Sequence, residues 1–220
     1  MFIEAIQERH SVRQYKNQAL EASIVARLEA ELAACNQESG LNIQLVTDEP
    51  RAFDNFMAHY GKFRGVKNYI ALIGQKRKGL EEQCGYYGER LVLKAQQLGL
   101  NTCWVGLTYR KISGAFQISS DEKLVLIIAL GYGKDQGHAH KSKDASKVSN
   151  LNHQSPAWFE AGVAAALLAP TAMNQQKFML ICEGSQVTAR AGKGFFAKVD
   201  LGIVKYHFEI AAGKNNFQWN

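Results

Sequence analysis

Two stretches of this chain carry glycines at the same spacing, and this repeat restricts the fold more than any other feature of the sequence. Gly88 and Gly99 are eleven positions apart, and so are Gly202 and Gly213. In both stretches apolar residues recur every three or four positions, as they do on the buried face of an amphipathic helix. The second glycine of each pair stands where a helix commonly ends. The repeat predicts two long helices in equivalent places of two related halves.

The order of elements around these helices favours the same interpretation. Each helix is preceded by a further expected helix and a strand, at residues 21–34 and 43–46 in the first half and at residues 157–168 and 178–181 in the second. The halves therefore cover approximately residues 1–145 and 155–220. Two matched spacings are also compatible with coincidence, so the duplication remains one of two interpretations.

Further apolar runs predict the strands of an α+β fold. The segments 69–73, 102–105 and 124–130 are rich in strand-forming residues and are bounded by glycine or polar residues. We expect a central mixed sheet flanked by helices, in one unit that spans residues 1–220. Residues 131–155 are rich in Lys, His, Asp, Ser and Gly, and we expect them to form a long exposed connection.

The composition excludes several classes of protein. Hydrophobic residues make up 46% of the chain and charged residues 21%, which is ordinary for a globular protein. No apolar run approaches the roughly 20 residues that cross a bilayer, and residues 1–13 lack the pattern of a secretory signal. We therefore expect a cytoplasmic protein with no membrane partner. The cysteines lie at wide spacings without a nearby histidine set, so we expect reduced thiols and no metal site at Cys35, Cys84, Cys103 and Cys182.

The net charge of +6 comes from basic residues spread along the chain, which argues against nucleic acid as a partner. A small cofactor that carries a phosphate would use the same excess, because only about three or four cations must converge on one dianion.

Residues 9–13 form the cluster R-H-S-x-R just after a short expected helix. Arg9, His10, Ser11 and Arg13 supply two guanidinium groups, an imidazole and a hydroxyl within five positions. Such directional donors bind a phosphate or the polar edge of a heterocycle. The alternative is a solvated helix end with Ser11 as its cap.

Two further segments combine small residues with amides or with an aromatic residue. One lies between an alanine-rich helix and a strand, and consists of Ala169, Pro170, Thr171, Ala172, Met173, Asn174, Gln175 and Gln176. Its small residues allow a flat ring to approach the backbone, and its amides can pair with ring carbonyls and nitrogens. The other is G-L-N-T-C-W-V-G at residues 99–106, a turn from helix to strand. A plain helix stop and a plain turn explain these two segments equally well.

Taken together, the three segments resemble the FMN-dependent nitroreductase family. That family has an R-R-S-x-R type phosphate grip, an A-P-S-A-x-N-x-Q-P segment that packs on the isoalloxazine, and a central helix that runs into G-L-G-T-C-W-I-G. A later strand of the family ends in G-Y-P, which corresponds to residues 131–133 here. The resemblance covers most of the chain, and the joint occurrence is more specific than any one motif.

The order of the motifs departs from that of ordinary members. Those members place the A-P-S-A-x-N segment after the first long helix, where this chain has Cys35 and Ser39 opposite Pro170 and Asn174. No R-x-S-x-R precedes the second-half helix either. In homodimeric members one subunit holds the phosphate and the other offers the loop. The resemblance therefore implies an internal pseudo-dimer with one complete flavin site, as in a divergent branch of the family that shares G-K-F-x-G-V-K-N-Y-I, found here at residues 61–70.

The resemblance also implies roles for single residues. Arg9, Ser11 and Arg13 would hold the phosphate and the pyrimidine side, Lys62 would lie near N1 and the C2 oxygen, and Trp104 to Gly106 would border N5. Lys141 and Lys143 correspond to a late basic residue on the phosphate, although a solvated linker explains them as well. The implied FMN-binding set is Arg9, His10, Ser11, Arg13, Lys62, Trp104, Val105, Gly106, Lys141, Lys143, Ala169, Pro170, Thr171, Ala172, Asn174 and Gln176. The usual Q-P-W is Gln176, Lys177 and Phe178 here, which changes the wall of the acceptor site.

The implied activity is two-electron transfer from NAD(P)H through FMN to a nitroaromatic, a quinone or a similar small acceptor. The cofactor carries the chemistry, so no catalytic side chain is expected. A flavin-binding carrier or sensor with little turnover is the main alternative, and a flavin-free scaffold is a third. An internal pseudo-dimer would be compatible with a monomer.

Overall fold

The computed structural model describes residues 2–220, and its larger sheet is wholly antiparallel. Its strands are β1 (Gln44–Val46), β2 (Asn68–Gln75), β3 (Asn101–Val105) and β4 (Glu122–Gly131), in the order β1-β2-β4-β3. β4 pairs with both β2 and β3, so that Ile128 lies opposite Ile70 on one side and Trp104 on the other. Every residue of β2 except Gln75 is buried, in agreement with the uninterrupted apolar run that predicted it.

A second, smaller sheet belongs to the C-terminal part of the chain. It contains β5 (Phe178–Glu183), β6 (Gln186–Ala191) and β7 (Gln218–Trp219). β5 and β6 form an antiparallel hairpin, and β7 pairs with β6 in parallel. The α+β class and the flanking helices are confirmed, but the single central mixed sheet is divided in two. We did not predict β6, because only one residue of its sequence Q-V-T-A-R-A is buried, namely Val187.

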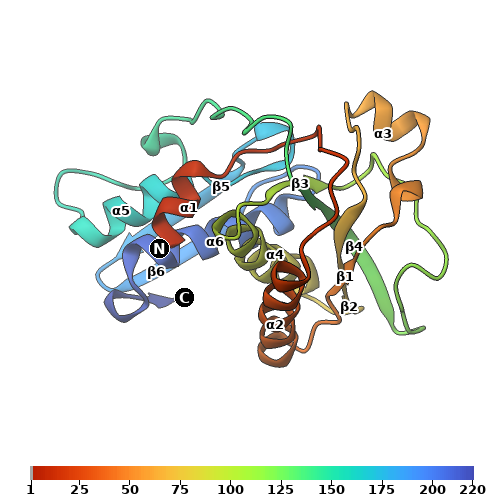
Figure 1. The fold of residues 1–220 in the computed structure, drawn as a ribbon. Helices are drawn as coiled ribbons and strands as arrows, with labels where there is room; N and C mark the ends of the chain where they lie inside the picture. The colour runs from red at the N-terminus through yellow and green to blue at the C-terminus, as the bar shows by residue number, and fades with distance from the viewer. Residues whose placement is uncertain (1) are drawn as a thin grey trace.

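The long helices stand between and around the two sheets (Figure 1). The α-helices are α1 (Phe2–Glu8), α2 (Ala22–Ser39), α3 (Phe56–Tyr60), α4 (Leu80–Gln97), α5 (Ala157–Ala166) and α6 (Ala197–Ala212). Four single turns of 3-10 helix cover Pro50–Ala52, Ala145–Lys147, Ala172–Asn174 and Lys214–Asn216. The four long helices that periodicity predicted all form, with boundaries that differ by a few residues. None of the helices in the described part has the length and apolar character to span a bilayer.

The two predicted glycine-bearing helices, α4 and α6, pack against each other at the centre of the molecule. Their closest approach is made by Gly85 and Gly202, each the sixth residue of its helix. A Cβ at either position would collide with backbone of the other helix, at Val199 and Glu82 respectively. Gly88, the counterpart of Gly202 in the glycine repeat, instead lies beneath the ring of Trp104. Gly85, which is not part of the repeat, makes the contact with α6.

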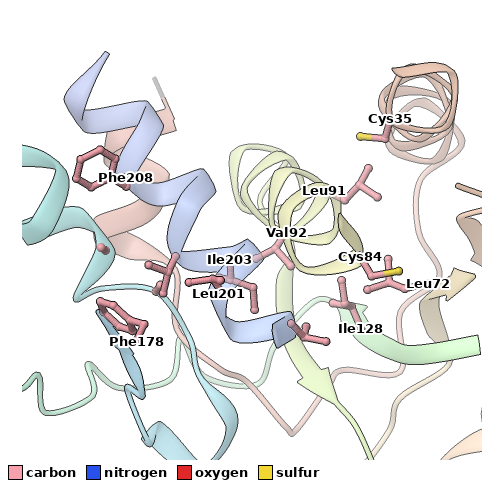
Figure 2. Close-up of a cluster of buried hydrophobic side chains, with 14 of the residues drawn as sticks. Cys35, Leu72, Cys84, Leu91, Val92, Ile128, Phe178, Leu201, Ile203 and Phe208 are labelled. Carbon is pink, nitrogen blue, oxygen red and sulfur yellow. The ribbon is translucent and has the colours of Figure 1, made fainter. Parts of the chain in front are cut away.

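One hydrophobic cluster runs through both halves of the chain (Figure 2). It contains Leu72 and Ile128 from the large sheet, Leu91 from α4, Ile203 from α6 and Phe178 from the small sheet, all buried. Because both sheets contribute to the same core, we expect neither half to fold without the other. Three of the four cysteines are buried and all four are free, as predicted.

Residues 131–155 were expected to form a long exposed connection, but part of the segment packs against the rest of the chain. The segment is mostly exposed, but Val148 is fully buried and Ser149 forms a bridge with Leu180 of β5. His140 and Ser142 both bond to the carbonyl of Leu167, just after α5. The segment thus forms a strap, residues 138–150, that lies along the second half of the chain.

Candidate functional site

The three sequence segments converge on one cavity of about 450 Å³. Its walls come from residues 11–13, from β3 and the turn after it, from the loop after α5, and from the first turns of α6. Eight of the sixteen predicted FMN-binding residues line it: Ser11, Arg13, Trp104, Val105, Gly106, Pro170, Thr171 and Ala172. Segments distant in sequence therefore share one hollow.

Backbone pairing places the N-terminal segment in this wall. After α1 ends at Glu8, the chain becomes extended and runs beside β3, where Ser11 pairs in parallel with Thr102. The amide of Val12 donates to the carbonyl of Thr102 at 3.0 Å, and the phenol of Tyr15 donates to the carbonyl of Val12 at 2.7 Å. The segment acts as a short extra strand, and this brings Ser11 and Arg13 to the cavity.

Arg9 and His10 do not line the cavity. The side chain of Arg9 is 3% exposed, and its Nε lies 3.9 Å from an oxygen of the fully buried Glu89. Burial lowers the pKa of Arg9, and the charge of Glu89 opposes that shift. Two of its nitrogens, Nε and one Nη, have no hydrogen-bond partner in the described chain. Burial and the charge of Arg9 likewise lower the pKa of His10.

The loop that follows α5 has a strained backbone. Met173, Asn174 and Gln176 all have positive φ, at 51°, 53° and 43°. Each such conformation costs a non-glycine residue about 1 to 3 kcal/mol, and clusters of them occur at ligand sites. The strain therefore requires strong local bonds to hold the loop in place.

Those bonds come from Asp200 in the first turns of α6. Its Oδ1 accepts from the backbone amide of Ala172 at 3.0 Å, and its Oδ2 accepts from the side-chain amide of Gln175 at 2.7 Å. Asp200 is only 4% exposed and itself lines the cavity. Burial raises its pKa to about 6, although the bonds from Gln175 and Ala172 oppose the shift.

The strap holds the other side of the same loop. The side-chain amides of Asn174 and Gln176 both donate to the carbonyl of Lys141, each at 2.9 Å. The ammonium of Lys143 donates to the carbonyls of Gln175 and Gln176. These four predicted site residues lie outside the cavity lining and connect the strap to the loop. Ala169 is buried behind the loop, and Lys62 is exposed between Gly61 and Phe63, which do line the cavity.

Trp104 is held by a polar network in the interior. Its indole nitrogen donates to Glu89 of α4, whose other oxygen lies 2.9 Å from Nε2 of His207 in α6. Nδ1 of His207 faces the carbonyl of Ala165 at 3.1 Å, so both ring nitrogens face acceptors. Glu89 thus connects the ring of Trp104 to both α4 and α6.

Sequence reasoning missed several lining residues. Asp200 was passed over as part of a helical repeat, although an acid among V-D-L-G-I-V was a visible exception to an apolar run. The mouth was missed as well, because its residues come from three separate loops. Leu107, Met173 and Phe195 line the cavity while 69%, 85% and 74% exposed. Large apolar groups at a cavity rim are typical of a site for a ligand with apolar surface.

Solved structures share this fold. A "putative nitroreductase" from Thermotoga maritima is 21% identical, with a TM-score of 0.68 over 96% of this chain and 82% of that one. An FMN-dependent nitroreductase from Clostridium difficile is 18% identical, with a TM-score of 0.53 over 68% of this chain and 99% of that one. A "putative nitroreductase" from Desulfovibrio desulfuricans, solved in complex with FMN, is 23% identical, with a TM-score of 0.54 over 70% and 98%.

Among proteins with curated descriptions, none matches this chain significantly in sequence. A family described as "Putative TM nitroreductase" matches residues 1–212, nearly the whole chain. That match agrees with the fold, with the convergence of the motifs on one cavity and with the resemblance seen in the sequence. The chain belongs to this nitroreductase family.

Proposed function

We propose that this chain is an FMN-dependent oxidoreductase that takes two electrons from NAD(P)H and passes them to an aromatic acceptor such as a nitroaromatic or a quinone. The observation that carries the proposal is the meeting of Ser11 and Arg13 with residues 170–172 in one cavity. These segments are far apart in the sequence, and no local contact brings them together. A flavin that contacts both is the common ligand that the family membership suggests.

The cavity suits the cofactor in size and in chemistry. Its volume of about 450 Å³ lies within the range of roughly 300 to 1,000 Å³ typical of small-molecule sites. Ser11 and Arg13 offer donors to an anionic or carbonyl-bearing edge, and the buried Arg9 behind them has two nitrogens without partners in the described chain. Val105, Pro170 and Ala172 supply apolar walls for a flat ring.

Bound flavin would supply the hydride chemistry, and the protein would position it. Arg13 would fix one edge of the ring system and favour negative charge there. Trp104, held by Glu89, would close the wall of β3, and the loop at residues 170–172, held by Asp200, would close the opposite wall. The apolar mouth at Leu107, Met173 and Phe195 favours an acceptor with aromatic surface.

We further propose that the chain is an internal pseudo-dimer with one site. Two of the similar structures align over nearly their whole length with only 68% and 70% of this chain. The remaining part of this chain could supply the half of the flavin site that a second subunit would otherwise provide. The loop lies in the second half, and the corresponding stretch of the first half, around Cys35 and Ser39, is continuous α2 helix. A monomer would thus contain a complete site, acting as we expect in the cytoplasm.

Absorption spectroscopy tests the proposal. Protein loaded with FMN should be yellow and should bleach within seconds when NADH or NADPH is added without oxygen, then recover colour when a quinone or a nitroaromatic is added. Bound flavin that neither nicotinamide bleaches would instead identify a carrier or sensor. Protein that neither binds FMN in titration nor gains thermal stability from it would overturn the proposal.

A further inference from the structure

Among the described residues that line the cavity, one has a carboxyl group, Asp200, and the proposed function uses it only to hold the loop at residues 170–172. Within the described chain, the titratable side chains that line the cavity are Arg13, Cys103 and Asp200. Arg13 is a permanent cation, and burial raises the pKa of the Cys103 thiol. Asp200 is therefore the lining group best able to release a proton at neutral pH.

We propose that Asp200 donates a proton to the acceptor in the second half of the reaction. This inference rests on the proposed function and adds a catalytic residue to it. Asp200 lies in the first turns of α6, and its neighbours Phe196, Val199 and Ile203 also line the cavity, so an acceptor bound there would lie beside Asp200.

The environment of Asp200 raises the pH at which its carboxyl group loses the proton. Burial raises its pKa to about 6, so that about half of the molecules carry this proton at pH 6 and roughly a tenth at pH 7. Arg13 and Cys103 are the other titratable groups of this cavity. Lys198, on the same helix, lines a separate hollow with Glu81, Lys123 and Lys193. No cation among residues 2–220 is bonded to Asp200, so nothing there holds it ionised.

The loop contacts leave room for this proton. Each carboxylate oxygen has two lone pairs, and the amides of Ala172 and Gln175 occupy one on each oxygen. One oxygen can therefore accept from the loop and still carry a proton toward the cavity. The same carboxyl group can position the loop and act as an acid.

The proton balance requires such a donor. Reduction of a quinone to a hydroquinone takes two electrons and two protons. Bound reduced flavin would supply a hydride, which carries both electrons and one proton, so the quinone would still lack one proton. The O–H bond of Asp200 breaks as the second O–H bond of the hydroquinone forms, and the carboxylate recovers its proton from water.

The experiment compares two acceptors in stopped flow, after anaerobic reduction of the FMN-loaded protein. 1,4-Benzoquinone needs protons, whereas ferricyanide takes single electrons and none. Reoxidation of wild type by benzoquinone should slow above pH 6, and reoxidation by ferricyanide should not. Asp200→Asn should lose about ten- to a hundredfold in the benzoquinone rate and the pH dependence with it. Asp121→Asn, a change of an exposed acid that does not line the cavity, is the matched control.

Several outcomes would overturn the inference. One is an unchanged benzoquinone rate and pH profile in Asp200→Asn; another is an equal loss with ferricyanide, which would indicate a structural role through the loop. If the variant does not fold, a pH-independent benzoquinone rate in wild type would have the same meaning. Protein that binds no FMN would contradict the proposed function itself.

A measurement without flavin is independent of turnover. Carbon-13 NMR of labelled aspartate carboxyls in flavin-free protein should show a resonance that titrates near pH 6 and is missing in Asp200→Asn. Titration of that resonance below pH 4.5 would also overturn the inference.

Discussion

The indole nitrogen of Trp104 donates a 2.9 Å hydrogen bond to Oε2 of Glu89, and this bond connects the wall of the cavity to the interior of α4. Glu89 is 0% exposed, as is His207, which lies against its other oxygen. The contact links β3, α4 and α6, three elements from both parts of the chain. The position of a cavity-lining ring thus depends on a carboxylate that does not itself line the cavity.

Replacing Glu89 should therefore affect both stability and the cavity. Glu89→Ala leaves the partners of a buried carboxylate uncompensated, and we expect the free energy of unfolding to fall by about 3 to 5 kcal/mol. Urea unfolding followed by circular dichroism measures this, with Glu160→Ala on the exposed face of α5 as control. Equal stability of the two variants would contradict the importance of the network.

The crossing of α4 and α6 should not accept a side chain. Gly202→Ala places a methyl group against the backbone of Glu82, and we expect a loss of about 3 kcal/mol or more. Gly99→Ala is the matched variant, because its Cβ meets no atom within 4 Å and its φ of 77° costs only about 1 to 2 kcal/mol. A loss in Gly202→Ala no larger than that in Gly99→Ala would contradict the inference that close contact with α4 requires glycine at position 202.

Arg13 and Arg9 should differ in what they support. Arg13 lines the cavity, so Arg13→Ala should weaken FMN binding by about 1.5 to 3 kcal/mol through loss of a charge-assisted bond. Fluorescence titration of FMN measures the change, and Arg27→Ala on the exposed side of α2 is the control. Arg9→Ala should lower stability in the flavin-free protein, since Arg9 lies beside Glu89 in the interior. Wild-type affinity in Arg13→Ala would remove that residue from the site.

The raised pKa of Asp200 has a consequence for stability. The folded state binds this proton with a pKa of about 6, against an ordinary value of 3.8, so the group favours folding below pH 3.8 and loses that contribution as pH rises to about 6. As pH rises across this window, wild type should lose up to about 3 kcal/mol of unfolding free energy that Asp200→Asn does not lose, because the amide does not titrate. Chemical unfolding of both proteins at pH 4 and pH 7 gives the difference. A difference that is the same at both pH values would show that the pKa is not raised.

The apolar mouth should affect aromatic acceptors more than flavin. Phe195→Ala removes an exposed ring from the cavity rim, and we expect KM for a quinone to rise about three- to tenfold while FMN affinity stays unchanged. Phe56→Ala is the matched control, because Phe56 on α3 is 80% exposed but does not line the cavity. Steady-state kinetics of both variants distinguish them, and an equal KM in the two would exclude Phe195 from acceptor binding.

Much of the local structure was determined by the sequence itself. Periodicity of three and four predicted α2, α4 and α6, the alanine-rich run at residues 157–168 predicted α5, and Gly99 and Gly213 follow their helices with positive φ as expected. These features depend on residues within one or two turns of each other, so the local sequence is sufficient to predict them. The two motif segments at residues 9–13 and 169–176 were also visible, because their chemistry is compressed into a few positions.

Only the tertiary structure decided which of these side chains face the cavity. Pairing of Ser11 with Thr102 turned Arg13 toward the cavity, while Arg9, at the end of α1, lies inside against Glu89. The strap drew the amides of Asn174 and Gln176 away from the cavity, and the approach of α4 to α6 brought Asp200 to its wall. Each of these outcomes depends on contact between segments far apart in the chain. Local patterns carry no information on such contacts, because the packing energy that selects them exists only once both surfaces are formed.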